Sequence, residues 1–309
     1  MEIIEITKNE YTQLLNNSKM TVPVYGDIEA IECYEKCEII KVVKNNLPVA
    51  VFLMPIDDNG IRREYRYFPY LMPILLKKES VLRQKEIYKV IFNYIFKKYN
   101  YTFIPLHPNF KIISAIASEG GLVEMRHTHV IKNKLTFESI NSKLRNHIRN
   151  AIDKVTLVID NSYKNFDFYQ AIKGKESEVI KRSELAKKLL NNNKAFIIKA
   201  KYNNKIVAGM LVVFDKEWAY LLHSYQKEKI RGVIPYMIME ATKEAFDKYK
   251  VKNFDLEGSV IEEIDNFFSS FDANIMSYPY IIQSKNQKKL YELIDRSMHI
   301  EGRIKEWKQ

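Results

Sequence analysis

The chain has 309 residues, and its hydrophobic fraction of 46% is enough to build one or two cores. Twenty tyrosines and sixteen phenylalanines exclude a disordered chain, and nine glycines with nine prolines argue against long linkers. The net charge of +11 favours an acidic partner: a phosphorylated cofactor, a nucleotide-linked substrate, tRNA or an anionic membrane surface. An excess of solvated lysines is the alternative explanation.

The first residues and the cysteines bear on the cellular compartment. MEIIEITKNEY is charged and lacks the apolar core of a signal peptide, and no stretch approaches the roughly eighteen apolar residues of a membrane span. We therefore expect a cytoplasmic protein. Cys33 and Cys37 have no second Cys or His pair nearby, so neither a disulfide framework nor a metal site is expected.

The first half of the chain alternates between strand and helix patterns. EIIKVVK and LPVAVFLMPI form a plausible hairpin, and REYRYFPYLM is a further extended piece. Apolar spacing then predicts a helix over 81–99, a strand over 101–107, a helix over 109–120 and a strand over 122–131.

The second half repeats this order. Strands are predicted at 195–202, 206–214 and 218–225, followed by a helix from residue 234, a strand at 254–259, a helix at 261–271 and a strand at 274–282. Two halves of order β-β-β-α-β-α-β suggest a duplicated α+β fold, with chance matching as the alternative. The predicted domains are 1–138, 139–283 and a helical tail, 284–309.

A basic helix is predicted between the halves, at 139–155. Leu144, Ile148 and Ile152 form an apolar stripe, and Arg145 and Arg149 lie one turn apart on a neighbouring face. Arginines at this spacing suit phosphate binding, although a solvated face has the same pattern.

The loop QKEKIRG precedes the helix of the second half. A helix N-terminus favours an anion, and the loop delivers cations and a glycine there. It is similar to the acyl-CoA loop of GNAT-fold acyltransferases, Gln/Arg-x-x-Gly-x-Gly/Ala, although only one of the glycines is present. The candidate donor-binding residues are Gln226, Lys227, Lys229, Arg231 and Gly232.

The stretch FDLEGS holds two carboxylates at alternate positions. In a strand, Phe254 and Leu256 would face one way and Asp255 and Glu257 the other. Ionised carboxylates need water, a cation or a chemical role. Ser259 begins a capping-box pattern with Glu262, so a structural role is the alternative for this residue.

Motifs along nearly the whole chain resemble FemAB-like, GNAT-fold proteins. RNHIRNA (145–151), VAG (207–209), FDLEGS (254–259) and FFSSFDA (267–273) follow the family order R-x-x-x-R-x-A, VAG, FD-x-EGS and FFRSFGA. Ser269 replaces the family arginine and Asp272 the glycine. The resemblance implies an α+β fold with two tandem GNAT-like domains, each a mixed, mostly antiparallel sheet flanked by helices, with the second domain catalytic and the first degenerate.

The resemblance also implies a reaction. The expected activity is metal-independent N-acyl transfer from acyl-CoA or a carrier-protein thioester to an amine, such as an amino sugar, an amino acid or a cell-envelope precursor. Alternatives are aminoacyl transfer from aminoacyl-tRNA and a binding module without catalysis. Glu257 is the expected base or amine anchor, Asp255 the second carboxylate and Tyr225 a proton donor. The expected substrate-binding residues are Arg145, Arg149, His223, Ser259 and Tyr278.

Overall fold

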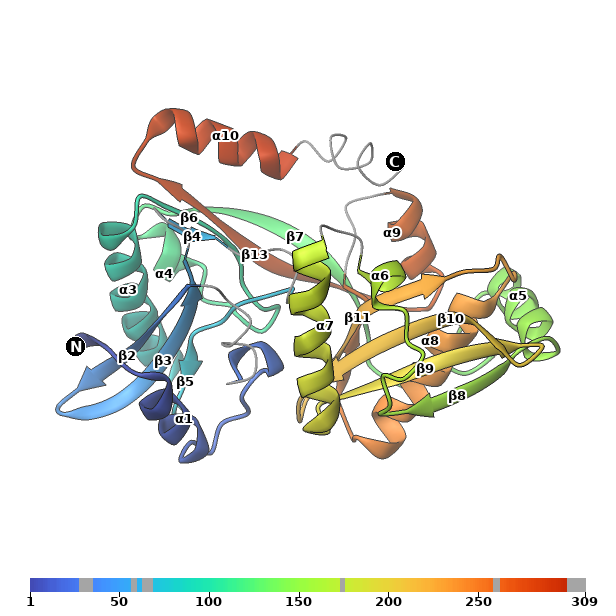
Figure 1. The fold of residues 1–309 in the computed structure, drawn as a ribbon. Coiled ribbons are helices and arrows are strands. Elements are labelled where there is room, and N and C mark those ends of the chain that lie inside the picture. Colours follow the sequence, from blue (N-terminus) through green and yellow to red (C-terminus); the bar gives the residue numbers. More distant parts are fainter. Residues whose placement is uncertain (28–35, 57–59, 63–68, 173–175, 258–261, 299–309) are drawn as a thin grey trace. The chain divides into compact units, whose positions relative to one another are not determined.

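A computed structural model describes residues 1–27, 36–56, 60–62, 69–172, 176–257 and 262–298 (Figure 1). None of the helices in these ranges is both long enough and apolar enough to cross a membrane.

The chain forms two compact units. One contains residues 1–127 together with 277–309, and the other contains residues 128–276. The unit boundaries fall inside two strands, β7 (Leu122–Ile131) and β13 (Asn274–Ser284). The boundaries predicted from the sequence, 138/139 and 283/284, lie elsewhere along the chain and stay predictions. The assignment of catalysis to one half stays a prediction.

The first unit is an α+β structure with two groups of paired strands. In the first group β1, β2, β3 and β5 pair in that order, and in the second β6 pairs with β4 and with the end of β13. Its remaining elements, in chain order, are β1 (Glu2–Glu5), α1 (Lys8–Asn16), a 3₁₀ turn (Val24–Gly26), β2 (Cys37–Lys44), β3 (Leu47–Pro55), β4 (Gly60–Arg62), β5 (Ile74–Leu75), α3 (Val81–Lys98), β6 (Tyr101–Pro105), α4 (Ser114–Ala117) and α10 (Gln287–Met298).

Helix α3 supplies much of the core of this unit. Ser80 caps it by accepting a hydrogen bond from the Arg83 N–H at 3.3 Å. Ile87, Ile91 and Ile95 follow at one-turn spacing and are fully buried against the strands. The i, i+4 spacing of apolar residues in α3 thus correctly predicts which face of the helix is buried.

The second unit carries a sheet in the order β12-β11-β10-β9-β8, and β12 pairs also with the end of β7. The β9, β10 and β11 strands form antiparallel hairpins, whereas β12 runs parallel to β11. Its remaining elements are α5 (Ser142–Ile152), β8 (Thr156–Asp160), α6 (Phe168–Ala171), α7 (Glu176–Asn191), β9 (Ala195–Tyr202), β10 (Lys205–Phe214), β11 (Trp218–Gln226), α8 (Val233–Lys243), a π turn (Glu244–Lys248), β12 (Asn253–Asp255) and α9 (Glu262–Ser269).

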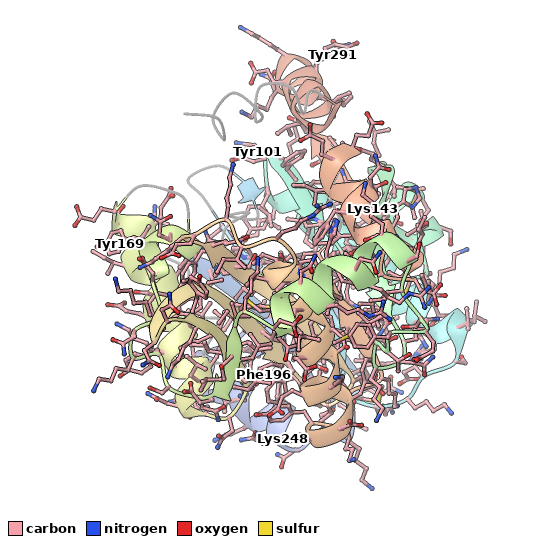
Figure 2. All side chains as sticks on the ribbon, turned by 90° about the vertical axis from the view of Figure 1, so that its right-hand side faces the viewer. Tyr101, Lys143, Tyr169, Phe196, Lys248 and Tyr291 are labelled. Atoms are coloured by element: carbon pink, nitrogen blue, oxygen red, sulfur yellow. The ribbon has the colours of Figure 1, made fainter. Side chains whose placement is uncertain are left out.

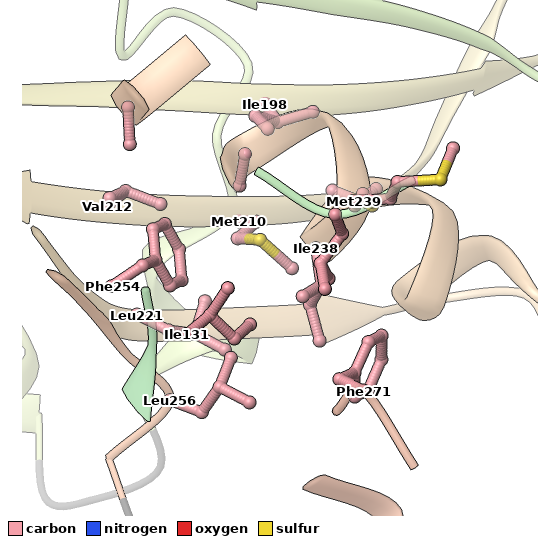
Figure 3. Close-up of a cluster of buried hydrophobic side chains, with 14 of the residues drawn as sticks. Ile131, Ile198, Met210, Val212, Leu221, Ile238, Met239, Phe254, Leu256 and Phe271 are labelled. Carbon is pink, nitrogen blue, oxygen red and sulfur yellow. The ribbon is translucent and has the colours of Figure 1, made fainter. Parts of the chain in front are cut away.

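The core of the second unit joins helix α8 to the sheet. Met237, Ile238 and Ala241 of α8 are buried, and Figure 3 shows Ile238 near Met210 of β10. Phe254 of β12 and Leu256 belong to the same cluster. The apolar half of FDLEGS is therefore core, as its pattern indicates.

The α+β fold with mostly antiparallel sheets confirms the predicted fold class. The order β-β-β-α-β-α-β over 195–284 is also present. Two parts of the strand pattern differ: β12 ends at Asp255 instead of residue 259, and an additional edge strand, β8, precedes β9.

Candidate functional site

The pairing of β11 with β12 is short. It covers only Trp218–Tyr220 of β11 and Asn253–Asp255 of β12, while β11 continues to Gln226. Beyond Tyr220 and Asp255, the two strands are therefore no longer paired. The acidic residues of FDLEGS lie where this pairing ends, and the basic loop follows the far end of β11.

The carboxylate of Asp255 is fully buried at this point. The Thr128 hydroxyl of β7 donates a hydrogen bond to Oδ1, and the Glu257 N–H donates to the same oxygen at 2.8 Å. Asp255 is opposite Val130 in the antiparallel register, so Thr128 is the diagonal neighbour on the same face of β7. A buried carboxylate needs such donors, because desolvation without hydrogen bonds is costly.

Glu257 stands on a turn that the Asp255 side chain closes. The Leu256 N–H still donates to the His129 carbonyl at 2.9 Å, but Glu257 then has a φ of 56°. An aspartate that bonds the backbone two residues ahead ends the strand in this way. The Asp255 carboxylate therefore contacts the Glu257 backbone in a turn, and the strand alternation expected for the two carboxylates is not present.

The left-handed backbone of Glu257 has an energetic cost. Residues other than glycine, asparagine and aspartate rarely adopt a left-handed backbone conformation. Backbone strain of this kind is often found at functional sites. Glu257 is half-buried. A carboxylate in this setting can accept a proton from an amine or bind an ammonium group. Ser259 lies outside the described residues.

His129 of β7 contacts two residues of α9 and was not among the predicted site residues. Its Nε2 atom lies 3.1 Å from Ser269 Oγ and 3.5 Å from Asp265 Oδ1. Because both contacts use one ring nitrogen, this group is not a serine–histidine–aspartate relay, in which the two partners occupy different nitrogens. Ser269, which stands where the FemAB-like motif has an arginine, thus contacts His129. No local pattern marks Thr128 or His129, because their partners Asp255 and Ser269 are 127 and 140 residues away in the sequence.

The basic loop after β11 is shaped by its own residues. The Gln226 side-chain amide donates to the carbonyls of Glu228 and Ile230, at 2.8 and 3.0 Å. The Lys227 ammonium pairs with Asp167 at 2.7 Å, and this pair lowers the pKa of Asp167 and raises that of Lys227. Gln226 and Lys227 therefore hold the loop, while Lys229 and Arg231 are exposed.

Gly232 places the start of α8 against α5. Its φ is 88°, and a Cβ atom there would lie 1.9 Å from the His147 carbonyl oxygen. Both the left-handed backbone and the lack of space for a Cβ atom require glycine at this position. Helix α8 begins without a side-chain cap, and the first N–H groups of any helix have no partner inside it.

Helix α5 brings further cations to this end of α8. Arg145 is half-buried, Arg149 is exposed, and Figure 2 shows Lys143 on the same helix. Desolvation lowers the pKa of His147, and the positive charges of Arg231 and Lys143 lower it further. The loop and α5 thus share one region of positive potential, which favours an anion.

The other predicted residues have structural contacts. His223 is buried with Nε2 3.1 Å from Arg182 Nη2, and burial, then the Arg182 charge, lower its pKa. The Tyr225 hydroxyl accepts a hydrogen bond from the Asp167 N–H at 3.3 Å, and burial raises its pKa. Tyr278 belongs to the first unit, where its ring centroid is 5.0 Å from that of Tyr70.

The described residues contain no group of three or more His, Cys, Asp or Glu side chains placed to hold a metal ion.

Replacing Thr128 by valine should lower the free energy of unfolding by about 1 to 3 kcal/mol, because the buried Asp255 carboxylate loses a donor. Urea unfolding followed by circular dichroism measures this. Thr102→Val is the control: Thr102 is fully buried, and its hydroxyl finds no hydrogen-bond partner among the described residues, so stability should be unchanged or higher. Equal losses in both variants would contradict the assigned Thr128–Asp255 bond.

Replacing Gly232 by alanine should destabilise the protein more than the same change at Gly120. Gly120 has a φ of 89° with nothing within 4 Å of an added Cβ, so Gly120→Ala should cost only the left-handed backbone strain of about 1 to 2 kcal/mol. Gly232→Ala adds the clash with α5. Thermal unfolding of both variants compares the costs, and a smaller loss at Gly232 would show that α5 does not pack there.

No family model matches the sequence, and no curated protein matches it. Solved structures do match along nearly the whole chain. FemX is 13% identical with a TM-score of 0.61, covering 96% of this chain and 100% of that one. L-PGS from Bacillus licheniformis is 8% identical with a TM-score of 0.59, covering 94% and 97%. A tandem GNAT protein from the clavulanic acid biosynthesis pathway is 9% identical with a TM-score of 0.55, covering 92% and 98%. The chain therefore has the GNAT-type fold of FemAB-like proteins, as its motifs predict.

Proposed function

We propose that the protein is an N-acyltransferase that moves an acyl group from a phosphate-containing thioester donor, acyl-CoA or an acyl carrier protein, to an amine. The observation that carries the proposal is the Glu257 carboxylate, held half-buried on a strained turn by the buried Asp255. FemX, L-PGS and the tandem GNAT protein are transferases of the same fold, which supports this reaction class. Candidate acceptors are an amino sugar, an amino acid or a cell-envelope precursor.

Glu257 would act on the acceptor. Its carboxylate binds the incoming ammonium and takes one proton, which frees the nitrogen lone pair to attack the thioester carbonyl. A C–N bond forms, the nitrogen loses its second proton to the surrounding water, the C–S bond breaks, and the thiolate leaves. Asp255 is fully buried, so its role is to position Glu257 rather than to touch the acceptor. This refines its expected part as the second carboxylate.

Tyr225 is the proposed proton donor to the leaving thiolate. Its hydroxyl accepts the Asp167 N–H, so its own proton stays available for donation. The raised pKa keeps the phenol protonated at neutral pH. His223, bonded to Arg182, would form part of the wall beside it. Roles for Tyr278 and Ser259 in acceptor binding stay predictions.

The donor phosphate is assigned to the start of α8. Gly232 brings that helix end against α5, and the charges of Arg231 and Lys143 both act on His147 at this contact. The proposed further phosphate contacts are Lys229 on the loop and Arg145 and Arg149 on α5. Cations and free helix N–H groups together favour a phosphate. The same charge would also serve an aminoacyl-tRNA donor, so that donor is the alternative.

The donor can be identified by thermal stabilisation. At a hundredfold excess over its Kd, CoA should raise Tm by about 5 °C. Arg231→Gln should reduce this shift, while Lys216→Gln, an exposed lysine before the other end of β11, should leave it unchanged. A response only to aminoacyl-tRNA analogues that falls steeply with salt would select the tRNA donor instead.

Glu257→Gln should lower kcat by about a hundredfold to ten-thousandfold, because the amide cannot accept the proton. The fold should keep its Tm, since the bond to Asp255 comes from the Glu257 backbone. Glu263→Gln, an exposed residue of α9, is the matched control and should retain full activity. With an identified substrate, an unchanged kcat for Glu257→Gln would remove this residue from catalysis and favour another base or the binding-module alternative.

A further inference from the structure

Two large aliphatic side chains stand in solvent at the start of α3. Val81 is 72% exposed and Leu82 is 69% exposed. Exposed aliphatic residues are common singly, but two neighbours of this size on the first turn of a helix form a protruding apolar pair.

The local structure holds this pair rigidly. The Ser80 cap fixes the first turn, and the Gln84 side-chain amide donates to the Glu79 carbonyl at 2.9 Å. Farther along the same helix, Ile87 and Ile91 are buried in the core of the unit. Val81 and Leu82 therefore cannot fold back without undoing the cap of a well-packed helix.

Lysines gather beside the pair. Lys77 and Lys78 precede it and are exposed. The Ser18 hydroxyl donates to the Leu76 carbonyl at 3.0 Å, which brings the exposed Lys19 to the same segment. The acidic side chains nearby are partly engaged: Glu79 lies 3.6 Å from Lys77, and Glu86 pairs with Arg83 at 2.6 Å.

A third apolar residue reaches this edge from the β2–β3 hairpin. The Leu76 N–H donates to the Val49 carbonyl at 3.0 Å, continuing the antiparallel pairing of β5 with β3. Leu47, two residues before Val49, is 63% exposed at the hairpin tip and lies opposite Lys44. The patch thus consists of Leu47, Val81 and Leu82 with Lys19, Lys44, Lys77 and Lys78.

We propose that this patch docks the protein on an anionic lipid surface. Aliphatic tips can enter the boundary between headgroups and acyl chains, while lysines contact lipid phosphates. A protein partner fits less well, because lysine is depleted in protein–protein interfaces. The net charge of +11 acts in the same direction. The inference does not depend on the proposed acyl transfer.

Vesicle flotation with the full chain tests the proposal. Phosphatidylcholine vesicles containing phosphatidylglycerol should carry the protein at low salt, and vesicles of phosphatidylcholine alone should not. Val81→Ser with Leu82→Ser should weaken binding by about tenfold or more, because two apolar side chains no longer leave water. Lys77→Gln with Lys78→Gln should weaken it by about tenfold, and added salt should do the same.

Ile275→Ser is the matched control, because this aliphatic residue is 65% exposed elsewhere on the chain. It should bind vesicles as the unaltered protein does. Circular dichroism confirms that every variant is folded. No binding to anionic vesicles, or equal loss in the Ile275 variant, overturns the proposal. A dimer in sedimentation velocity that the Val81/Leu82 variant abolishes, without vesicle binding, would assign the patch to self-association instead.

Discussion

The candidate site depends on one buried carboxylate. Asp255 lies in a position with no access to solvent, where an ionised group is stable only with donors at hand. The hydroxyl of Thr128 and the peptide N–H of Glu257 meet this need, and they come from different parts of the chain. The same two bonds end strand β12, join it to β7 and set the direction of the following side chain. Stability and the proposed chemistry are thus coupled at this residue.

A second constraint acts through the backbone alone. Gly232 lets the start of α8 meet the His147 carbonyl of α5 at a distance that no side chain would permit. Two cationic segments that are far apart in sequence therefore meet, and burial, then the charges of Arg231 and Lys143, lower the pKa of His147 between them. A glycine, rather than a charged residue, decides where the positive potential lies.

Much of the fold followed from periodicity in the sequence, because buried stripes and alternating strands leave direct patterns. β9, β10, β11, β7 and α3 were predicted within about two residues of their ends. The edge strand β8 was not predicted, since its side chains are all exposed or half-buried and its apolar pattern is weak. Helix α7 is likewise not predicted, because its many charged residues weaken the apolar pattern of its buried face.

The site was less accessible to sequence reasoning. Glu257 and Asp255 were selected from their spacing, but Thr128 is 127 residues from its partner and has no local signal. The early end of β12 depends on a side-chain bond that a strand pattern does not contain. The cations of the basic loop predict an anion site, but one of them, Lys227, pairs with Asp167, and the neutral Gln226 bonds to the loop carbonyls. Both residues shape the loop, although both are exposed as Lys229 and Arg231 are.

The return of β13 to the first unit has a consequence for biosynthesis. The β6 strand receives β13 as its antiparallel neighbour, and the Ser284 hydroxyl bonds to the Asn100 carbonyl from 184 residues away. At roughly 5 to 20 residues per second, a ribosome needs about 10 to 40 s to deliver that strand after β6. During this interval one edge of β6 is open to incorrect pairing. The unit that begins first along the chain is therefore the last to be completed.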